Sequence, residues 1–345
     1  MIKTIITKDC SSKLTGFQLS VTKLLENFKM FNSYNRFIED GLNAGISDAR
    51  KTDENKQKNI FLQSFNPMLG KMEWKAQPDD YDYHQEIARA AFADMLHDTE
   101  RNKLYYEGLK CAIKRKRESG EKVHVLDIGT GTGLLAMMGA KLGADKVTAI
   151  EEFGPMYNCA KKVIEANGYG DKIVVIGKRS TEVDELDERA NILVTEVFDT
   201  ELIGEAAIAT FNHAHEHLLT SDCIVVPCEG TIYAQVVSSD LVAKWESLHP
   251  IAINKSVELA VGHNPPEPSY SLALHDLQLS QLSSDNFKVL TQPVPVFHFD
   301  FNSADGSRIP TDQQTVKTST ILNSGTCDAV FMWWDISMDS EKVCI

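Results

Sequence analysis

The sequence lacks any apolar run approaching the ~18 residues that a membrane-spanning helix needs. No signal-peptide core is indicated either, because Lys8 and Asp9 interrupt the short apolar stretch at the start. The seven cysteines are an odd number without paired spacing, and Cys223 and Cys228 alone lie close together, so neither a disulfide framework nor a zinc site is indicated. We therefore expect a protein of a reducing intracellular compartment, with no membrane and no metal as partner.

Positive charge is also scarce. Lys and Arg total 35 against 49 Asp and Glu, which gives a formal net charge of −14 at pH 7. A protein that holds nucleic acid by its phosphates needs a basic face, so direct nucleic-acid binding is disfavoured and cationic partners are favoured. The amino-acid composition, with 43% hydrophobic and 24% charged residues, is typical of a folded globular protein. The 345 residues suffice for one large domain or two joined units.

Residues 1–60 form an expected N-terminal extension that differs from the rest in charge. They carry ten Lys and Arg against seven Asp and Glu, whereas the remaining residues carry 25 against 42. Apolar residues recur at three- and four-residue steps from Val21 to Leu42, after a capping-box pattern at Thr15 and Gln18. This pattern predicts one amphipathic helix. Residues 47–60 are polar and predict a solvated linker.

Residues 61–121 are expected to form a helical region that begins with a short strand near Met72–Trp74. Asp82 and Asp98 can each cap a helix in this region. The second helix ends in the basic stretch Lys114–Arg117. Because cations interact favourably with the carboxyl end of a helix, we favour a structural role for this stretch over a nuclear-import signal.

Apolar strands alternate with helices over residues 122–227, which predicts an α/β fold with a parallel, doubly wound, Rossmann-like sheet. The expected strands are Val123–Ile128, Lys146–Ile150, Lys172–Ile176, Ile192–Thr195 and Cys223–Val226, with helices from Thr132, Pro155 and Glu205. After Pro227 helices nearly vanish, so residues 228–345 predict a β-rich second unit. Its expected strands are Thr231–Val237, Val257–Val261, Ser271–Leu277, Val294–Phe301, Gln314–Leu322 and Ala329–Ile336.

A glycine-rich loop follows the first of these strands. Gly129, Thr130, Gly131 and Gly133 come directly after Asp127 and precede a helix. Glycine lets the backbone approach a ligand without a Cβ in the way. The spacing departs from the G-x-G-x-x-G of dinucleotide enzymes, and an acid at the strand end suits a positively charged ligand that has no pyrophosphate.

A second acid, Glu151, ends the next strand, where a carboxylate can hold both hydroxyls of a ribose. Asp127, the glycine loop and Glu151 together are typical of S-adenosylmethionine-dependent methyltransferases. A purely structural strand-to-helix turn and a nicotinamide enzyme are the alternatives.

Two glutamates flank the loop after the fourth strand. Glu196 stands at the strand end and Glu205 at the start of the next helix, so a hairpin-like loop can bring their carboxylates face to face. At this end of a doubly wound sheet, loops line the ligand crevice. The planar guanidinium group, with its pKa above 12, is the cation that two carboxylates fit best. The alternative is a helix cap with surface charges beside it.

Residues from about Trp74 to Asp339, which contain these motifs, resemble the protein arginine methyltransferase family. The resemblance is strongest to the first module of those members that carry two modules. The matching stretches are Tyr81–Arg89, Asp94–Asp98 with Arg101, Val125–Leu135, Glu196–Glu205 and Met332–Ile336. The resemblance implies a class I S-adenosylmethionine-dependent domain followed by an incomplete β-barrel with a segment like the family's dimerisation arm. It also implies S-adenosylhomocysteine as product and no metal.

The resemblance implies roles for residues on the donor side. Arg101 is expected to hold the methionine carboxylate of the donor, and Met95 to pack near the reacting methyl group. Asp127 and the loop Gly129–Gly133 are expected to shape the donor pocket, and Glu151 to take the ribose.

On the acceptor side, Glu196 and Glu205 are expected to be the catalytic glutamate pair. Asp199 would suit basic residues that flank the target arginine, and His84 is a candidate substrate contact. The resemblance further implies monomethylation of basic proteins such as histones or RNA-binding proteins, in the cytoplasm and nucleus.

Two departures from the family pattern keep alternatives open. No tryptophan follows a histidine, whereas the family places such a pair on a loop that closes the arginine site. The second module is also absent, so we expect a fragment or shortened form, in which a homodimer could replace that module. A catalytically silent donor-binding or dimer-forming relative is therefore a second hypothesis. A small-molecule or RNA methyltransferase is a third, which the acidic charge disfavours.

Two further motifs favour structural roles over functional ones. His213 and His217 share a helix face, but no clear third ligand accompanies them or His215. Trp333 and Trp334 are expected to pack within the β-rich unit rather than to form an aromatic cage.

Overall fold

The computed structural model divides the chain into two compact units, residues 1–29 with 100–345 and residues 30–99. The larger unit therefore contains segments from all four regions predicted from the sequence. Residues 2–5, 18–20, 59–66, 71–78, 92–246, 251–254, 257–259, 273–277, 283–303 and 306–339 are described.

The smaller unit contains the antiparallel hairpin of β3 (Asn59–Asn66) and β4 (Lys71–Pro78) and the short helix α3 (Phe92–His97). The strand predicted near Met72–Trp74 is confirmed. The strand that pairs with it, β3, was not predicted. Asn59 and Ile60, the last two residues of the predicted linker, lie in this strand. The apolar run that follows them favours an extended conformation. Asp82, the predicted cap, lies outside the described residues.

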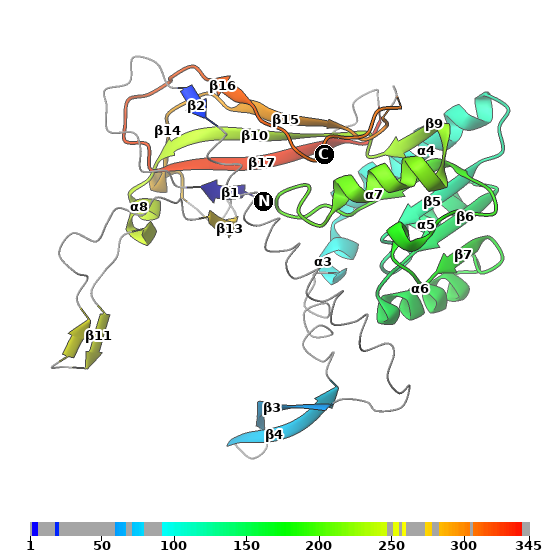
Figure 1. Ribbon diagram of the computed structural model, residues 1–345, viewed down its shortest axis with the longest axis horizontal. Coiled ribbons are helices and arrows are strands. Elements are labelled where there is room, and N and C mark those ends of the chain that lie inside the picture. The colour runs from blue at the N-terminus through cyan, green and yellow to red at the C-terminus, as the bar shows by residue number, and fades with distance from the viewer. Residues whose placement is uncertain are drawn as a thin grey trace. The chain divides into compact units, whose positions relative to one another are not determined.

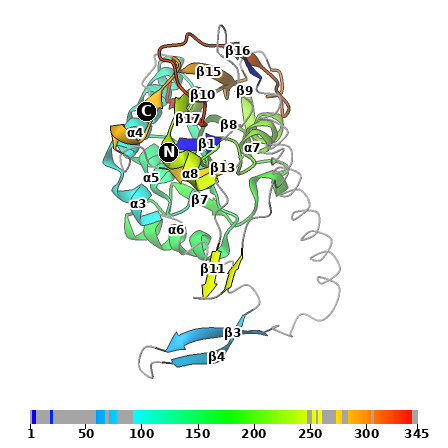
Figure 2. The same ribbon diagram turned by 90° about the vertical axis from the view of Figure 1, so that its left-hand side faces the viewer.

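The larger unit contains a five-stranded parallel sheet in the order β7-β6-β5-β8-β9, which confirms the predicted doubly wound sheet. Figure 2 shows α4, α5 and α6 on one side of this sheet and α7 on the other. The strands are β5 (His124–Ile128), β6 (Lys146–Ile150), β7 (Ile173–Ile176), β8 (Ala190–Thr195) and β9 (Leu219–Val226). The helices are α4 (Thr99–Glu118), α5 (Leu134–Lys141), α6 (Gly154–Ala166) and α7 (Ala207–His213), which continues as a π-helical turn over Ala214–Leu218.

The inner strands are buried on both faces because helices cover both sides of the sheet. Every residue of β5 and of β8 is buried. Such continuous burial is typical of parallel sheets, whose strands read as unbroken apolar runs.

The β-rich part of the same unit is an antiparallel sheet in the order β13-β1-β17-β10-β14, with β15 also paired to β10. Figure 1 shows β10, β15 and β17 running beside one another. The elements are β1 (Ile2–Ile5), β10 (Glu229–Ser238), β13 (Ala273–Leu277), β14 (Lys288–Val289), β15 (Val294–Asp300) and β17 (Ala329–Ser337). Additional elements are α8 (Asp240–Glu246) and the hairpin of β11 (Ile251–Asn254) and β12 (Val257–Leu259).

One element contradicts the sequence analysis. Gln18 lies in strand β2 (Gln18–Ser20), which pairs with β16 (Val316–Thr318), so it does not begin a helix as the capping-box pattern predicted. Pairing across nearly 300 positions of sequence, which a local pattern cannot reveal, decides the conformation here. The rest of the predicted helix, residues 21–42, lies outside the described residues.

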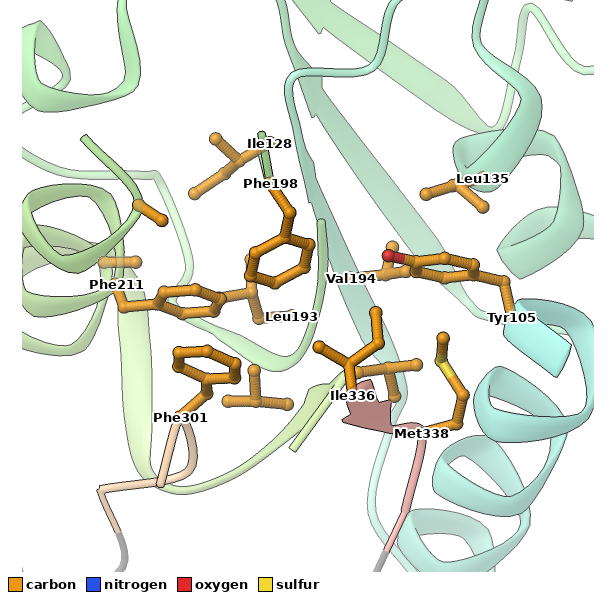
Figure 3. Close-up of a cluster of buried hydrophobic side chains, with 14 of the residues drawn as sticks. Tyr105, Ile128, Leu135, Leu193, Val194, Phe198, Phe211, Phe301, Ile336 and Met338 are labelled. Atoms are coloured by element: carbon orange, nitrogen blue, oxygen red, sulfur yellow. The ribbon is translucent and has the colours of Figure 1, made fainter. Parts of the chain in front are cut away.

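A single buried cluster joins the parallel sheet to the β-rich sheet. Phe211 of α7 stacks on Phe301 with ring centroids 4.4 Å apart, and Phe198 lies 5.5 Å from Phe301. Ile336 of β17 and Met338, directly after that strand, are buried in the same cluster. Figure 3 shows these side chains converging between the two sheets. The two sheets therefore share one core.

Candidate active site

The site lies where the order of the parallel strands reverses, between β5 and β8. β5 pairs with β6 on one side and with β8 on the other. In such sheets the loops at the carboxyl ends of these two strands diverge and leave a crevice for a ligand. The glycine loop follows β5 and Glu196 follows β8, so the topology brings together the two motifs that the sequence analysis singled out.

The glycine loop needs its glycines for conformation and for space. Gly129 and Gly133 adopt φ of +72° and +87°, the left-handed region that disfavours other residues. A Cβ at Gly133 would lie 3.0 Å from Ile164, and one at Gly129 would lie 3.2 Å from Val197. The loop therefore closes tightly over the end of β5.

Asp127 is fully buried beneath this loop. Its Oδ2 accepts hydrogen bonds from Thr130 Oγ1 at 2.5 Å and from the backbone N–H of Ala136 at 2.8 Å. Oδ1 is buried and has no hydrogen-bond partner within the described part of the chain. Burial raises the pKa of Asp127 to about 7, although the hydrogen bonds from Thr130 and Ala136 oppose the shift. An unsatisfied buried acceptor of this kind is costly unless a ligand donates to it.

Glu151 follows β6 and faces the glycine loop. Its Oε2 accepts the N–H of Gly131 at 2.8 Å, and its Oε1 accepts the N–H of Phe153 at 2.9 Å. Two backbone donors thus orient the carboxylate. Since each oxygen has a second lone pair, the group can still accept two further hydrogen bonds.

Arg101, near the start of α4, and Glu196, directly after β8, form an ion pair. Nη1 of Arg101 lies 3.3 Å from Oε2 of Glu196. The guanidinium carbon lies 5.6 Å from the ring centroid of Tyr105, whose hydroxyl donates to the carbonyl of Thr195 at 3.2 Å. Sequence reasoning missed Tyr105, although it stands one helical turn after Arg101, where side chains on a helix meet.

The two glutamates are in electrostatic contact. Burial raises the pKa of Glu196, the charge of Arg101 opposes the shift, and the charge of Glu205 adds to it. Glu205 is the more exposed of the two residues. Burial of its carboxyl and the charge of Asp199 both raise the pKa of Glu205. Three of the four acids of this ten-residue loop thus interact electrostatically, an arrangement that favours a cationic ligand.

Asp199 supports the loop between the two glutamates. Its Oδ1 accepts the N–H groups of Glu201 at 2.9 Å and Gly204 at 3.0 Å. Its backbone carbonyl accepts the indole N–H of Trp334 at 3.1 Å. The sequence predicted only that Trp334 packs within the β-rich unit. Its hydrogen bond to Asp199 is an additional contact that was not predicted. Whether Asp199 also contacts substrate stays a prediction.

Two of the predicted site residues are not placed with the others. Met95 lies in α3, which belongs to the smaller unit, and His84 lies outside the described residues. Their roles toward donor and substrate stay predictions.

The histidines and the basic stretch have structural partners. The rings of His213 and His217 stack with centroids 4.6 Å apart, and Nε2 of His215 lies 2.8 Å from the carbonyl oxygen of Phe301. Within the described residues no group of three or more His, Cys, Asp or Glu side chains could hold a metal ion. Each member of the basic stretch Lys114–Arg117 forms an ion pair. None of the described helices is long and apolar enough to cross a membrane.

Solved structures share this fold. An arginine methyltransferase of Trypanosoma brucei, PRMT1 in an enzyme-prozyme heterotetrameric complex with AdoHcy, matches with a TM-score of 0.51 and 19% identity, over 71% of this chain and 72% of that one. Arabidopsis thaliana protein arginine methyltransferase 10 matches with a TM-score of 0.52 and 20% identity, over 74% of this chain and 73% of that one. The model of the ribosomal protein L11 methyltransferase family (PrmA) matches residues 108–220. The chain therefore has a Rossmann-like methyltransferase fold followed by a β domain.

Closer relatives in sequence are much longer than this chain. Protein arginine N-methyltransferase 7 of Drosophila grimshawi is 47% identical over 288 residues, which are 81% of this chain and 40% of the relative. The protein of the same name from Drosophila erecta is 49% identical over 286 residues, 81% of this chain and 41% of the relative. The chain thus spans about two fifths of the length of the curated relatives it matches. These comparisons confirm the resemblance predicted from the sequence: over about four fifths of its length the chain is related to the protein arginine N-methyltransferases.

Proposed function

We propose that the chain transfers a methyl group from S-adenosylmethionine to a guanidinium nitrogen of protein arginine. The observation that carries this proposal is the partly buried Glu196, electrostatically coupled to Glu205, beside the glycine loop at the strand-order reversal. The sequence relationship to arginine methyltransferases supports the same function.

The residues around the glycine loop fit the donor. Oδ1 of Asp127 is a buried acceptor without a partner in the described residues, which suits an ammonium group. Glu151 is oriented by two backbone donors and keeps lone pairs for ribose hydroxyls. The guanidinium of Arg101 can pair with a carboxylate in addition to Glu196. When bound, the donor supplies an electrophilic methyl group on a sulfonium.

The two glutamates can offset the repulsion between a cationic substrate and the cationic donor. A guanidinium about 4 Å from a sulfonium is repelled by roughly 4 kcal/mol at an effective dielectric of ~20. Two carboxylates facing the guanidinium more than offset this repulsion. They also hold one nitrogen in a set direction, so that positioning and fixed charge supply most of the rate enhancement.

Glu196 is also suited to move a proton. The methylated guanidinium must lose a proton to avoid a doubly charged product. Oε2 of Glu196 faces Arg101, which leaves Oε1 for the substrate. Because burial raises the pKa of Glu196, its carboxylate is a better proton acceptor than an exposed one.

Basic proteins, such as histones or RNA-binding proteins, are the proposed substrates. The net charge of −14 favours encounter with cationic chains, and Asp199 adds an acid beside the clamp. Monomethylarginine as product, action in the cytoplasm and nucleus, and association of two copies of this chain belong to the same proposal.

The experiment is a transfer assay with a matched pair of peptides. The 345-residue chain is incubated with S-adenosylmethionine and an arginine-rich peptide or its lysine-substituted counterpart, which has the same charge. Mass spectrometry is expected to show one added methyl group on the arginine peptide and none on the lysine peptide. Equal transfer to both would contradict guanidinium specificity, and donor binding without transfer would favour the catalytically silent hypothesis.

A further inference from the structure

The loop that carries both glutamates is held in an unfavourable backbone conformation. Leu202 and Ala206 adopt φ of +71° and +61°, the left-handed region that is rare for residues with a side chain. Such conformations persist where the surroundings impose them. The contacts that restrain this loop therefore decide where Glu205 stands relative to Glu196.

The internal restraints converge on Asp199. Its side chain accepts the N–H groups of Glu201 and Gly204, and its carbonyl accepts the N–H of Leu202 at 3.0 Å. A Cβ at Gly204 would lie 1.8 Å from Oδ2 of Asp199, so the backbone at Gly204 lies directly against this carboxylate. If Asp199 shifts, the segment that leads to Glu205 shifts with it.

A side chain from outside the loop also contacts Asp199. Trp334, on β17 of the β-rich sheet, donates its indole N–H to the carbonyl of Asp199 at 3.1 Å. Its ring lies 6.2 Å from that of Phe198, the residue before Asp199. β17 is paired along its whole length with β10, so Trp334 stands on a rigid support.

We propose that Trp334 is a positioning residue, which sets the geometry of the glutamate pair by anchoring the backbone of Asp199. It contacts the carbonyl of Asp199 and acts on Glu196 and Glu205 through that backbone. The catalytic consequence rests on the proposed function, whereas the anchoring contact does not.

The test replaces Trp334 with 3-benzothienylalanine, which has the shape of tryptophan but a sulfur in place of the N–H. Trp334→Phe serves as a second variant. Hydrogen exchange of the peptide amides at 201–204 is expected to accelerate roughly five- to tenfold, because one hydrogen bond is lost while the aromatic packing stays. In the transfer assay, kcat is expected to fall roughly tenfold, with the donor Kd and the melting temperature unchanged.

The same replacement at Trp333 is the matched control. Trp333 neighbours Trp334 on β17, and its side chain points to the opposite face, where it stacks on Tyr233 at 5.8 Å. The control is expected to leave loop exchange and kcat unchanged. Unchanged exchange in the Trp334 variants would overturn the proposal. If the unsubstituted chain transferred no methyl group, the proposed function would fail, while the exchange comparison would still decide the role of Trp334.

Discussion

Asp127 is held in an environment very different from that of a free side chain. It is fully buried, one of its oxygens has no partner among the described residues, and burial raises its pKa from 3.8 to about 7. The folded chain therefore binds this proton more tightly than the unfolded chain does. Between these two pKa values the folded state holds more protons, so the free energy of unfolding falls as pH rises through this window.

Asp127→Asn removes this titration. Without donor, the stability of the variant relative to the unsubstituted chain is expected to increase between about pH 4 and about pH 7, by an amount on the order of a few kcal/mol. Denaturant unfolding at several pH values measures the difference.

The control is Asp145→Asn, at an exposed aspartate. A hydrogen bond from the backbone N–H of Val123 lowers the pKa of Asp145, so this carboxylate contributes stability that is lost as pH falls. Its variant should show a pH trend of the opposite sign. If the Asp127 variant and the unsubstituted chain showed parallel profiles of stability against pH, the pKa of Asp127 would not be raised in the folded chain.

At the scale of elements, the aromatic cluster beneath the glutamate loop joins α7, the loop and the β-rich sheet. Phe301 is fully buried and packs against both Phe198 and Phe211. Because the cluster belongs to one core, a cavity there weakens both sheets at once. The loop above it then loses its support.

Phe301→Ala is expected to lower the free energy of unfolding by about 3–5 kcal/mol, the usual cost of deleting a buried phenylalanine. The two sheets are expected to unfold in one transition. Denaturant unfolding followed by tryptophan fluorescence and circular dichroism measures both effects. Val174→Ala, at an apolar residue of β7 that is 56% exposed, should change stability little. A cost below about 1 kcal/mol for Phe301→Ala would contradict a shared core.

The parts of the fold that the sequence predicted are those with strong local patterns. The five parallel strands were predicted because their apolar runs stand between regular helices. The glycine loop and Glu196 were located by their positions at strand ends, and Glu205 by its position before the next helix. Strand β2 and the role of Trp334 were not predicted. Trp334 lies 135 positions from Asp199, and no local periodicity reports a contact at that separation.

At the scale of the whole molecule, the proposed donor pocket on β5 and β6 lies beside the proposed cation clamp that follows β8. Arg101 connects the two, because it contacts Glu196 and is also the residue expected to hold the donor carboxylate. Changing a single charge on the acceptor side is therefore expected to separate donor binding from methyl transfer.

Glu196→Gln is the substitution expected to separate donor binding from methyl transfer. It tests the proposed role of Glu196 most directly. Calorimetry is expected to give a donor Kd close to that of the unsubstituted chain, because the amide oxygen can still accept from Arg101. Transfer to the arginine peptide is expected to fall by a factor on the order of 10² or more, since the guanidinium loses a carboxylate partner. Glu165→Gln, at an exposed glutamate of α6, is the control and should leave both quantities unchanged. Full transfer by Glu196→Gln would contradict the account.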